Sequence, residues 1–237
     1  MAVYITGDTH GRFDGLKKFC KEMNLTKDDT IIILGDAGFN YYLDDRDTWG
    51  KKKVRDLAPT ILCVHGNHEC RPRHIKSYVL AGKFGGEIYV EPNYPNIGFL
   101  CDGQVYNIPS KDGTVHDVLV CGGAYSVDKY YRLSRGFSWF PDEQPDATTK
   151  EYVEEVLDKR NWEIDDIFTH TGPVSLEPVE MFLLGIDQSK VDKTTEIWFE
   201  DILNKLKSFK QWWFGHYHCN KIVNEQVRIL FNEFVEF

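Results

Sequence analysis

Short apolar runs alternate with amphipathic segments over the first hundred residues. The runs VYIT at 3–6, IIIL at 31–34 and ILCV at 61–64 are uninterrupted and rich in β-branched residues, as strands buried on both faces are. The segments 13–23 and 45–57 between them have helical spacing. Strand, helix, strand, helix, strand at this interval predicts βαβ units and a parallel sheet.

The remainder of the chain shows a different pattern. Residues 87–125 read as short strands with hairpin turns. Residues 126–145 are loop-rich and hold aromatic side chains, two arginines and two prolines. Beyond them the pattern predicts a helix near 147–160, a strand at 165–169, a helix near 193–208, a strand ending in WWF, and a hairpin-like pair over 227–237. With no internal repeat, low-complexity tract or linker, we expect one α/β domain with mixed sheets over residues 1–237.

The acidic balance argues against one class of function. The formal net charge is −9 and the sequence pI is about 5.4. A nucleic-acid-binding protein that relies on a broad basic surface is therefore not expected, because phosphate contacts dominate that affinity. A phosphate substrate is still compatible with this charge, since bound divalent cations reverse the local sign.

Three features bear on the cellular compartment. No stretch approaches about 18 consecutive apolar residues, the length of a transmembrane helix. The N-terminus turns polar after VYIT, unlike a secretory signal. The six cysteines are scattered without a CxxC pair. We therefore expect reduced thiols in a cytoplasmic protein that has no membrane partner.

Five predicted strands end in polar residues that can bind metal. In chain order these residues are Asp8, His10, Asp36, Asn67, His68, His170, His216 and His218. In open α/β sheets the ligand site lies outside the carboxyl ends of the strands, so we expect these side chains to share one rim. The i, i+2 spacing within the first pair and within the last pair places both side chains on one side of extended backbone.

The residue types indicate a transition-metal site. Imidazole, carboxylate and amide oxygen together suit Mn²⁺, Fe, Co²⁺ or Zn²⁺. Five of the eight histidines of the chain lie at these strand ends. Seven such ligands are too many for one ion, and they fit two ions about 3.5–4 Å apart that share a bridging carboxylate and a hydroxide.

The order of these motifs resembles that of the calcineurin-like metallophosphoesterases, which are marked by D-x-H, GD, GNH[DE], a lone H and GHxH. Here the motifs read Asp8-x-His10, Gly35-Asp36, Gly66-Asn67-His68-Glu69, His170 and Gly215-His216-Tyr217-His218. The resemblance implies a four-layer α/β/β/α sandwich of two mixed sheets with the site on its rim. It also implies a phosphatase or phosphodiesterase with two divalent metal ions, Mn²⁺ first, with Fe, Zn, Co or Ni as alternatives.

The resemblance further implies a role for each residue. Asp8, His10 and His218 would hold the first metal ion. Asn67, His170 and His216 would hold the second, and Asp36 would bridge both. His68 would not be a ligand. It would protonate the leaving-group oxygen while a metal-bridging hydroxide attacks phosphorus.

Departures from subfamily patterns narrow the substrate class. Ser/Thr protein phosphatases read GDxxDRG at the second motif, where this chain reads GDAGFNYYLDDR with Arg46 displaced. DNA-repair nucleases of the superfamily carry extra DNA-binding domains and broader basic surfaces. We therefore expect a small or nucleotide-like phosphoester as the substrate. A nuclease acting on nucleic-acid ends and a non-catalytic protein-binding scaffold of the same fold stay open as alternatives, and no protein partner is identified.

Several side chains near the motifs are candidates for substrate binding. Arg12 follows the first motif and Arg71 follows GNHE, and guanidinium groups bind phosphate bidentately. Loops over a rigid scaffold often carry specificity, so Tyr125, Arg132 and Arg135 are rival candidates on the segment 126–145 or beside it. The alternative for that segment is an ordinary surface loop.

The stretch ILCVHGNHEC at 61–70 has a rival explanation as a zinc knot built from Cys63, His65, His68 and Cys70. No second Cys/His cluster lies nearby to complete the usual closed structural site. We therefore expect Cys63 and His65 to pack in the core. The lysine run at 51–53 is expected to be a solvated helix face.

Overall fold

Two mixed β-sheets form the centre of the molecule, as a computed structural model of all 237 residues shows. The first sheet has the order β13-β1-β2-β3-β6-β5-β4 and the second the order β11-β12-β10-β9-β8-β7. The first sheet comprises β1 (Val3–Thr6), β2 (Thr30–Ile33), β3 (Thr60–Cys63), β4 (Val79–Lys83), β5 (Gly86–Glu91), β6 (Tyr94–Leu100) and β13 (Val235–Glu236). The second comprises β7 (Val105–Pro109), β8 (Val115–Cys121), β9 (Asp166–Thr169), β10 (Gln211–Phe214), β11 (Lys221–Asn224) and β12 (Val227–Ile229).

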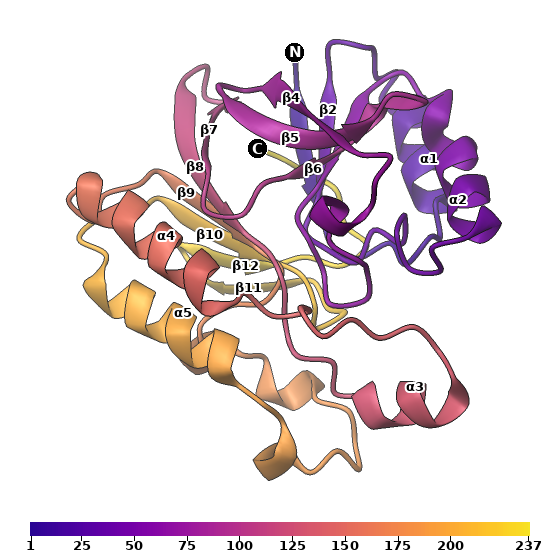
Figure 1. Ribbon diagram of the computed structural model, residues 1–237. Helices are drawn as coiled ribbons and strands as arrows, with labels where there is room; N and C mark the ends of the chain where they lie inside the picture. The colour runs from indigo at the N-terminus through magenta and orange to yellow at the C-terminus, as the bar shows by residue number, and fades with distance from the viewer.

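Five α-helices accompany the sheets: α1 (Asp14–Glu22), α2 (Asp45–Arg55), α3 (Lys129–Arg135), α4 (Ala147–Lys159) and α5 (Thr194–Lys205). Single-turn 3-10 helices lie at Pro72–His74, Val174–Leu176, Val179–Met181 and Gln188–Lys190. Figure 1 shows α1 and α2 beside the first sheet and α4 and α5 covering the outer face of the second. The predicted four-layer α/β/β/α sandwich is thus confirmed. No helix combines the length and apolar character needed to cross a bilayer.

The core has one apolar layer at each interface between the structural layers. Ile5 and Ile32 of the first sheet meet Val118 and Phe168 of the second in the central layer. A separate cluster packs the first sheet against α1 and α2, and another packs the second sheet against α4 and α5. Strands β1, β2 and β3 are therefore buried on both faces, which is why they lack the alternation of a half-exposed strand.

Parallel pairing determines where the strand ends lie. Strands β1, β2 and β3 run parallel to one another. Strands β9 and β10 also run parallel within the second sheet. The carboxyl ends of each parallel set consequently lie together at one edge of its sheet.

The predicted hairpin over 227–237 is wrong. Strand β12 pairs antiparallel with the preceding strand β11, in the second sheet. Strand β13 instead pairs with β1 in the first sheet, with Ile5 opposite Val235. Figure 1 shows this last segment returning to the first sheet, and Phe237 is buried between the sheets. The periodicity of two adjacent strands does not reveal which sheet each one joins.

Two other local expectations need correction. Lys51 is not solvated: its side chain is buried, with its ammonium 2.5 Å from Glu91 of β5, whereas Lys52 and Lys53 are exposed. The segment 126–145 is more than a loop, since it contains α3, which ends at Gly136 in the left-handed conformation. The burial of Lys51 follows from a contact between residues 40 positions apart, which a local pattern does not carry.

Candidate metal centre

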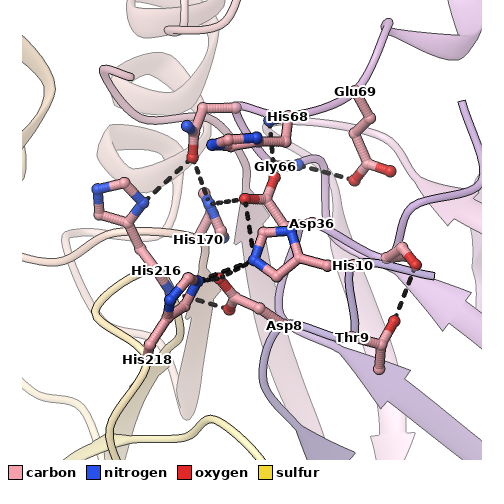
Figure 2. Close-up of polar contacts among 12 residues, drawn as sticks. Asp8, Thr9, His10, Asp36, Gly66, His68, Glu69, His170, His216 and His218 are labelled. Atoms are coloured by element: carbon pink, nitrogen blue, oxygen red, sulfur yellow. Dashed lines mark hydrogen bonds and ion pairs between the residues drawn. The ribbon is translucent and has the colours of Figure 1, made fainter. Parts of the chain in front are cut away.

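The predicted ligands come together at the strand ends. Strands β1, β2 and β3 are followed by Asp8, His10, Asp36 and Asn67, and strands β9 and β10 by His170, His216 and His218. In Figure 2 the carboxylates of Asp8 and Asp36 and the imidazoles of His10, His170 and His218 point toward one another across the junction of the two sheets. Each sheet therefore supplies part of the cluster, and neither sheet contains a complete one.

One half of the cluster consists of Asp8, His10 and His218. The Nε2 atoms of the two imidazoles are 2.8 Å apart. Asp8 Oδ2 lies 3.3 Å from Nε2 of His218 and 3.8 Å from Nε2 of His10. This carboxylate oxygen is buried and has no hydrogen-bond partner. A buried anionic oxygen that faces two imidazole nitrogens has the donor set and the unmet charge of a cation site.

The other half consists of Asn67, His170 and His216. The amide oxygen of Asn67 lies 2.8 Å from His170 Nε2 and 3.1 Å from His216 Nδ1. Asp36 Oδ2 lies between the halves, 3.6 Å from His170 Nε2 and 3.9 Å from His10 Nε2. The carboxylate of Asp36 is therefore placed to serve both halves.

The two oxygens of Asp8, and likewise those of Asp36, have different partners. Asp8 Oδ1 accepts the backbone N–H of His216 at 3.0 Å, and Asp36 Oδ1 accepts the backbone N–H of His68 at 2.8 Å. The Oδ2 atoms are left facing the imidazoles. His170 is fixed in the same way, because its Nδ1 bonds the carbonyl of Leu34 at 2.7 Å and leaves Nε2 for the cluster.

Two glycines at strand ends permit this close packing. A Cβ on Gly35 would lie 2.0 Å from Nδ1 of His170, and a Cβ on Gly66 would lie 2.0 Å from Oδ1 of Asp36. Any side chain at either position would displace a cluster residue from the neighbouring strand. The glycines of the GD and GNHE motifs are thus required by the approach of side chains from elsewhere.

Backbone conformation also distinguishes the cluster. His10, Asp36, His216 and His218 have φ of +46°, +47°, +65° and +50°, in the left-handed region. Residues with a Cβ occupy this region at a cost of about 1 kcal/mol or more each. Four of the nine non-glycine residues with positive φ thus belong to the cluster, and such strain is typical of a functional site whose geometry the surrounding fold imposes.

Mutual electrostatics shift the ionisation of the cluster. Burial alone would raise the pKa of Asp36, but the charge of His170, with His68 and His10, holds it well below its ordinary value. Burial opposes protonation of His170, yet Asp36 raises its pKa to about 9. Burial lowers the pKa of His216 to about 3. Protons and anionic oxygens thus share the cluster, and bound cations would take the place of those protons.

The residues present fit a pair of divalent cations. The fit rests on the unpartnered Asp8 Oδ2 and on three groups of side chains whose ligand atoms lie within 4.8 Å of one another. The groups are Asp8, His10 and His218; His10, Asp36 and His68; and Asp8, Asp36 and His170. They overlap at Asp8, His10 and Asp36, as expected where two sites share a boundary.

His68 stands at the mouth of the cluster. Its side chain is 27% exposed, and its Nε2 lies 3.8 Å from Asp128 Oδ1. Its ring meets that of His10 edge to face, with the centroids 5.4 Å apart. Because its backbone N–H is bonded to Asp36, the position of His68 is tied to the central carboxylate. The ring can therefore reach a molecule bound at the cluster without replacing a buried ligand.

The orientation of the Asn67 amide is fixed by the segment 126–145. Its Nδ2 donates to Ser126 Oγ at 2.8 Å, which turns the amide oxygen toward His170. Ser126 is in turn bonded by Arg132 Nη1 at 3.1 Å and donates its backbone N–H to Glu143 at 3.1 Å. This segment therefore supports the cluster from behind.

Ser126→Ala is expected to weaken metal binding by about 10- to 100-fold, because the Asn67 amide loses the acceptor that sets its orientation. Calorimetric titration of the metal-free protein with Mn²⁺ measures the change. Ser134→Ala is the matched control, since the Ser134 hydroxyl only donates to a carbonyl of its own helix. Equal affinities in the two variants would show that Ser126 has no influence on the amide.

The proposed arginines are not gathered around the cluster. Arg71 is buried and pairs with Asp102, and it lines a separate cavity of about 260 Å³. Arg132 is buried behind Asn67, and its Nε and Nη2 have no partner. Arg135 and Arg12 are exposed, and Arg135 lies over the ring of Tyr131. Tyr125, by contrast, lines the cavity beside the cluster.

Two grooves flank the cluster. The apolar groove, a cavity of about 440 Å³, is walled by Val127, Met181, Phe182, Leu183, Ile186 and Val191. The aromatic groove, of about 430 Å³, is walled by Tyr41, Tyr42, Arg46, Trp49 and Lys53. His10 and His68 line both. Sequence reasoning missed most of these wall residues. The sequence signal for the wall of the apolar groove was the apolar composition of residues 179–186. The residues that flank this segment are too polar for a core strand.

The zinc-knot explanation of 61–70 finds no support. Cys63 and His65 are buried, as expected, and none of the three candidate metal groups contains a cysteine. Glu69 closes the turn instead, because its Oε1 accepts the N–H of Gly66 at 3.0 Å. Burial, with the charge of Asp36, raises the pKa of Glu69 to about 8. All six cysteines are free.

Comparison with known proteins agrees with the motif pattern. A family model described as calcineurin-like phosphoesterase matches residues 1–220. The resemblance drawn from the motifs is thereby confirmed. A search of curated protein sequences found no significant match.

Solved structures of similar shape include two that align over 96% of this chain. One is phosphopantetheinyl hydrolase from Mycobacterium tuberculosis, at 14% identity and a TM-score of 0.47 over 87% of its own chain. The other is TT1561 of Thermus thermophilus, at 11% identity and a TM-score of 0.47 over 88% of its chain.

Proposed function

The chain belongs to the calcineurin-like phosphoesterase family, and from this premise we propose that it is a dinuclear-metal-dependent hydrolase of small or nucleotide-like phosphoesters. Family membership and the candidate metal-ligand groups support metal-dependent phosphoester hydrolysis. The observation that carries the proposal is the convergence of seven imidazole, carboxylate and amide ligands from two sheets on one cluster.

The roles proposed for the side chains follow their placement. Asp8, His10 and His218 would hold one ion, and Asn67, His170 and His216 the other, with Asp36 shared. Two divalent cations held there would supply charge neutralisation at the phosphoryl oxygens and a water of lowered pKa. The protein's own contribution is to fix these ligands through backbone hydrogen bonds, so that little reorganisation is needed during the reaction.

His68 is proposed as the general acid. An alkoxide leaving group needs a proton, and an imidazole within reach can supply it. His68 is partly exposed and lines both grooves, which places it beside a phosphoester held at the cluster. Asp128, 3.8 Å from its Nε2, is suited to orient the ring and to stabilise its protonated form.

Metal identity and compartment are also part of the proposal. Mn²⁺ is the metal we propose first, with Fe, Zn, Co or Ni as alternatives, because imidazole and oxygen ligands together suit these ions. We propose a cytoplasmic location because the six cysteines are free thiols and five of them are buried.

The experiment is hydrolysis of p-nitrophenyl phosphate and bis-p-nitrophenyl phosphate by the Mn²⁺-loaded protein, together with a count of bound metal. We expect about two ions per chain and turnover of at least one ester. Protein that binds no metal and hydrolyses neither ester would contradict the proposal and favour a protein-binding scaffold. Cleavage of single-stranded DNA ends in preference to both esters would instead favour a nuclease.

A further inference from the structure

The two grooves beside the cluster have opposite chemistry. The apolar groove contains no lysine or arginine, and its polar residues include the carboxylates Asp128, Glu177 and Glu196. The aromatic groove contains Arg46 and Lys53 and no carboxylate. His10 and His68 belong to both walls, so the grooves open on the same metal cluster from two directions. A molecule cleaved at the cluster can therefore extend into both.

The wall of the apolar groove contains apolar side chains that are exposed and not part of the core. Met181, Leu183 and Val127 are 49%, 66% and 37% exposed, although each carries a sizeable apolar side chain. At the base of the groove Glu196 is 4% exposed, and its Oε2 has no hydrogen-bond partner. Such a surface gains most from covering by an apolar chain that offers one hydrogen-bond donor to the carboxylate.

The aromatic groove likewise presents unburied rings. Trp49 is 62% exposed on α2, and Tyr42 is 43% exposed with the guanidinium of Arg46 stacked 3.8 Å from its ring centroid. Arg46 is also paired with Asp44 at 2.7 Å, whereas Lys53 forms no ion pair. Exposed aromatic rings beside a cation are suited to stack a planar ring and to attract the negative charge of a phosphodiester.

From these two walls we infer that the substrate is a phosphodiester with two unlike halves, an apolar chain in the apolar groove and a planar ring in the aromatic groove. This inference rests on the proposed function. A phosphomonoester has only one organic group and would leave one groove empty. A substrate with further anionic groups on its chain would meet the carboxylates of the apolar groove, which disfavour it.

The reaction balances as a hydrolysis. The oxygen of water forms one new bond to phosphorus, and one ester P–O bond breaks. The departing oxygen gains a proton, so that half leaves as an alcohol, and the other half is retained as a phosphomonoester. Because His68 lines both grooves, it lies near the ester oxygens on either side of phosphorus.

The test uses the Mn²⁺-loaded full chain and three probes: adenosine 5′-monophosphate, its methyl ester and its octyl ester. Release of product is followed by chromatography. Burial of each methylene is worth about fourfold in kcat/KM, so the octyl ester is expected to exceed the methyl ester by at least about tenfold. The monoester is expected to be a poor substrate.

Variants assign each half to its groove. Leu183→Asp is expected to lower kcat/KM for the octyl ester by about tenfold or more relative to the methyl ester, so that the octyl preference is lost, and Val115→Asp, an exposed site on β8, is the matched control. Trp49→Ala is expected to lower kcat/KM for both adenylyl esters by about fivefold or more, with rescue by Trp49→Phe. Both sites are exposed, so the variants are expected to fold.

The outcomes separate this inference from the proposed function. Equal kcat/KM for the octyl and methyl esters, or preference for the monoester, would overturn the two-sided substrate while p-nitrophenyl esters are still hydrolysed. Failure on every ester, p-nitrophenyl esters included, in protein with two bound ions would overturn the proposed function instead.

Discussion

Asp36→Asn is expected to reduce hydrolysis by at least about three orders of magnitude and to release bound metal. The carboxylate of Asp36 faces imidazoles of both halves, 3.9 Å from His10 Nε2 and 3.6 Å from His170 Nε2. Replacing it with an amide removes the negative charge that balances two cations. A loss of several kcal/mol of transition-state stabilisation corresponds to this factor.

Asparagine is the right replacement because it preserves the backbone. Asp36 has φ of +47°, a conformation that Asn tolerates better than most residues with a Cβ. The amide oxygen can still accept the N–H of His68, as Oδ1 of Asp36 does. A loss of activity in this variant can therefore be attributed to the charge and not to a rearranged turn.

The measurements are metal content by mass spectrometry and turnover of the better p-nitrophenyl ester. Asp166→Asn is the matched control, because Asp166 is also buried and bonds His116 at 2.6 Å outside the metal cluster. Its effect is expected on stability only. Retention of both ions and of activity by Asp36→Asn would refute the shared-carboxylate arrangement.

His68→Ala is expected to lower kcat by about 10²- to 10⁴-fold, the usual contribution of a general acid, while both ions stay bound. Distinguishing a loss of turnover from a loss of metal is informative because His68 also belongs to a candidate metal group with His10 and Asp36. The backbone N–H that bonds Asp36 is unchanged by the substitution. The central carboxylate should therefore keep its position.

Turnover and metal content are measured on the same preparations of this variant. His74→Ala is the control, since His74 is an exposed imidazole that bonds only the loop residues Arg73 and Asp142. Loss of one ion from His68→Ala would make His68 a ligand and would overturn its assignment as an acid. A substrate with a better leaving group should narrow the gap to the wild-type protein if protonation is the missing step.

The sequence predicted the parts of the fold whose signal is local. The strands at 3–6, 31–34 and 61–64 were recognisable because each is buried on both faces and bounded by glycine or polar residues. The helix expected near 147–160 is observed at Ala147–Lys159, where Asp146 caps it by accepting the N–H of Thr149. Local pattern and observed element agree wherever a strand or helix faces a continuous core.

The convergence of the candidate metal ligands could also be predicted, because their residue types and motif order can be read in the sequence. The hydrogen bonds that hold these side chains in place could not be predicted. Ser126 accepts a hydrogen bond from Asn67, which is 59 residues away in the chain. No periodicity or spacing in the sequence links these two loop residues. Arg132, a candidate for substrate binding, is buried, and its Nη1 donates to Ser126 Oγ, a contact that the sequence did not reveal.

The walls of the grooves escaped prediction for a different reason. Met181 ends the single-turn 3-10 helix Val179–Met181, and Leu183 follows it in an irregular stretch. Exposed apolar residues there have neither the period of a helix nor that of a strand. Trp49 lies on α2, whose buried side chains are Asp47, Lys51 and Val54, so its exposure depends on how the helix is rotated against the sheet. Only the three-dimensional arrangement reveals such residues as walls of a groove.

The division of the ligands between the two sheets has a consequence for how the chain acquires its metal. The first sheet provides Asp8 and Asp36, while His170 and His218 come only with the second. A partly folded chain in which one sheet has formed has at most an incomplete coordination set and cannot hold both ions. Because each sheet supplies only part of the ligand set, we expect metal uptake to follow the assembly of both sheets. Bound ions would then act as a clamp that holds the assembled sheets together.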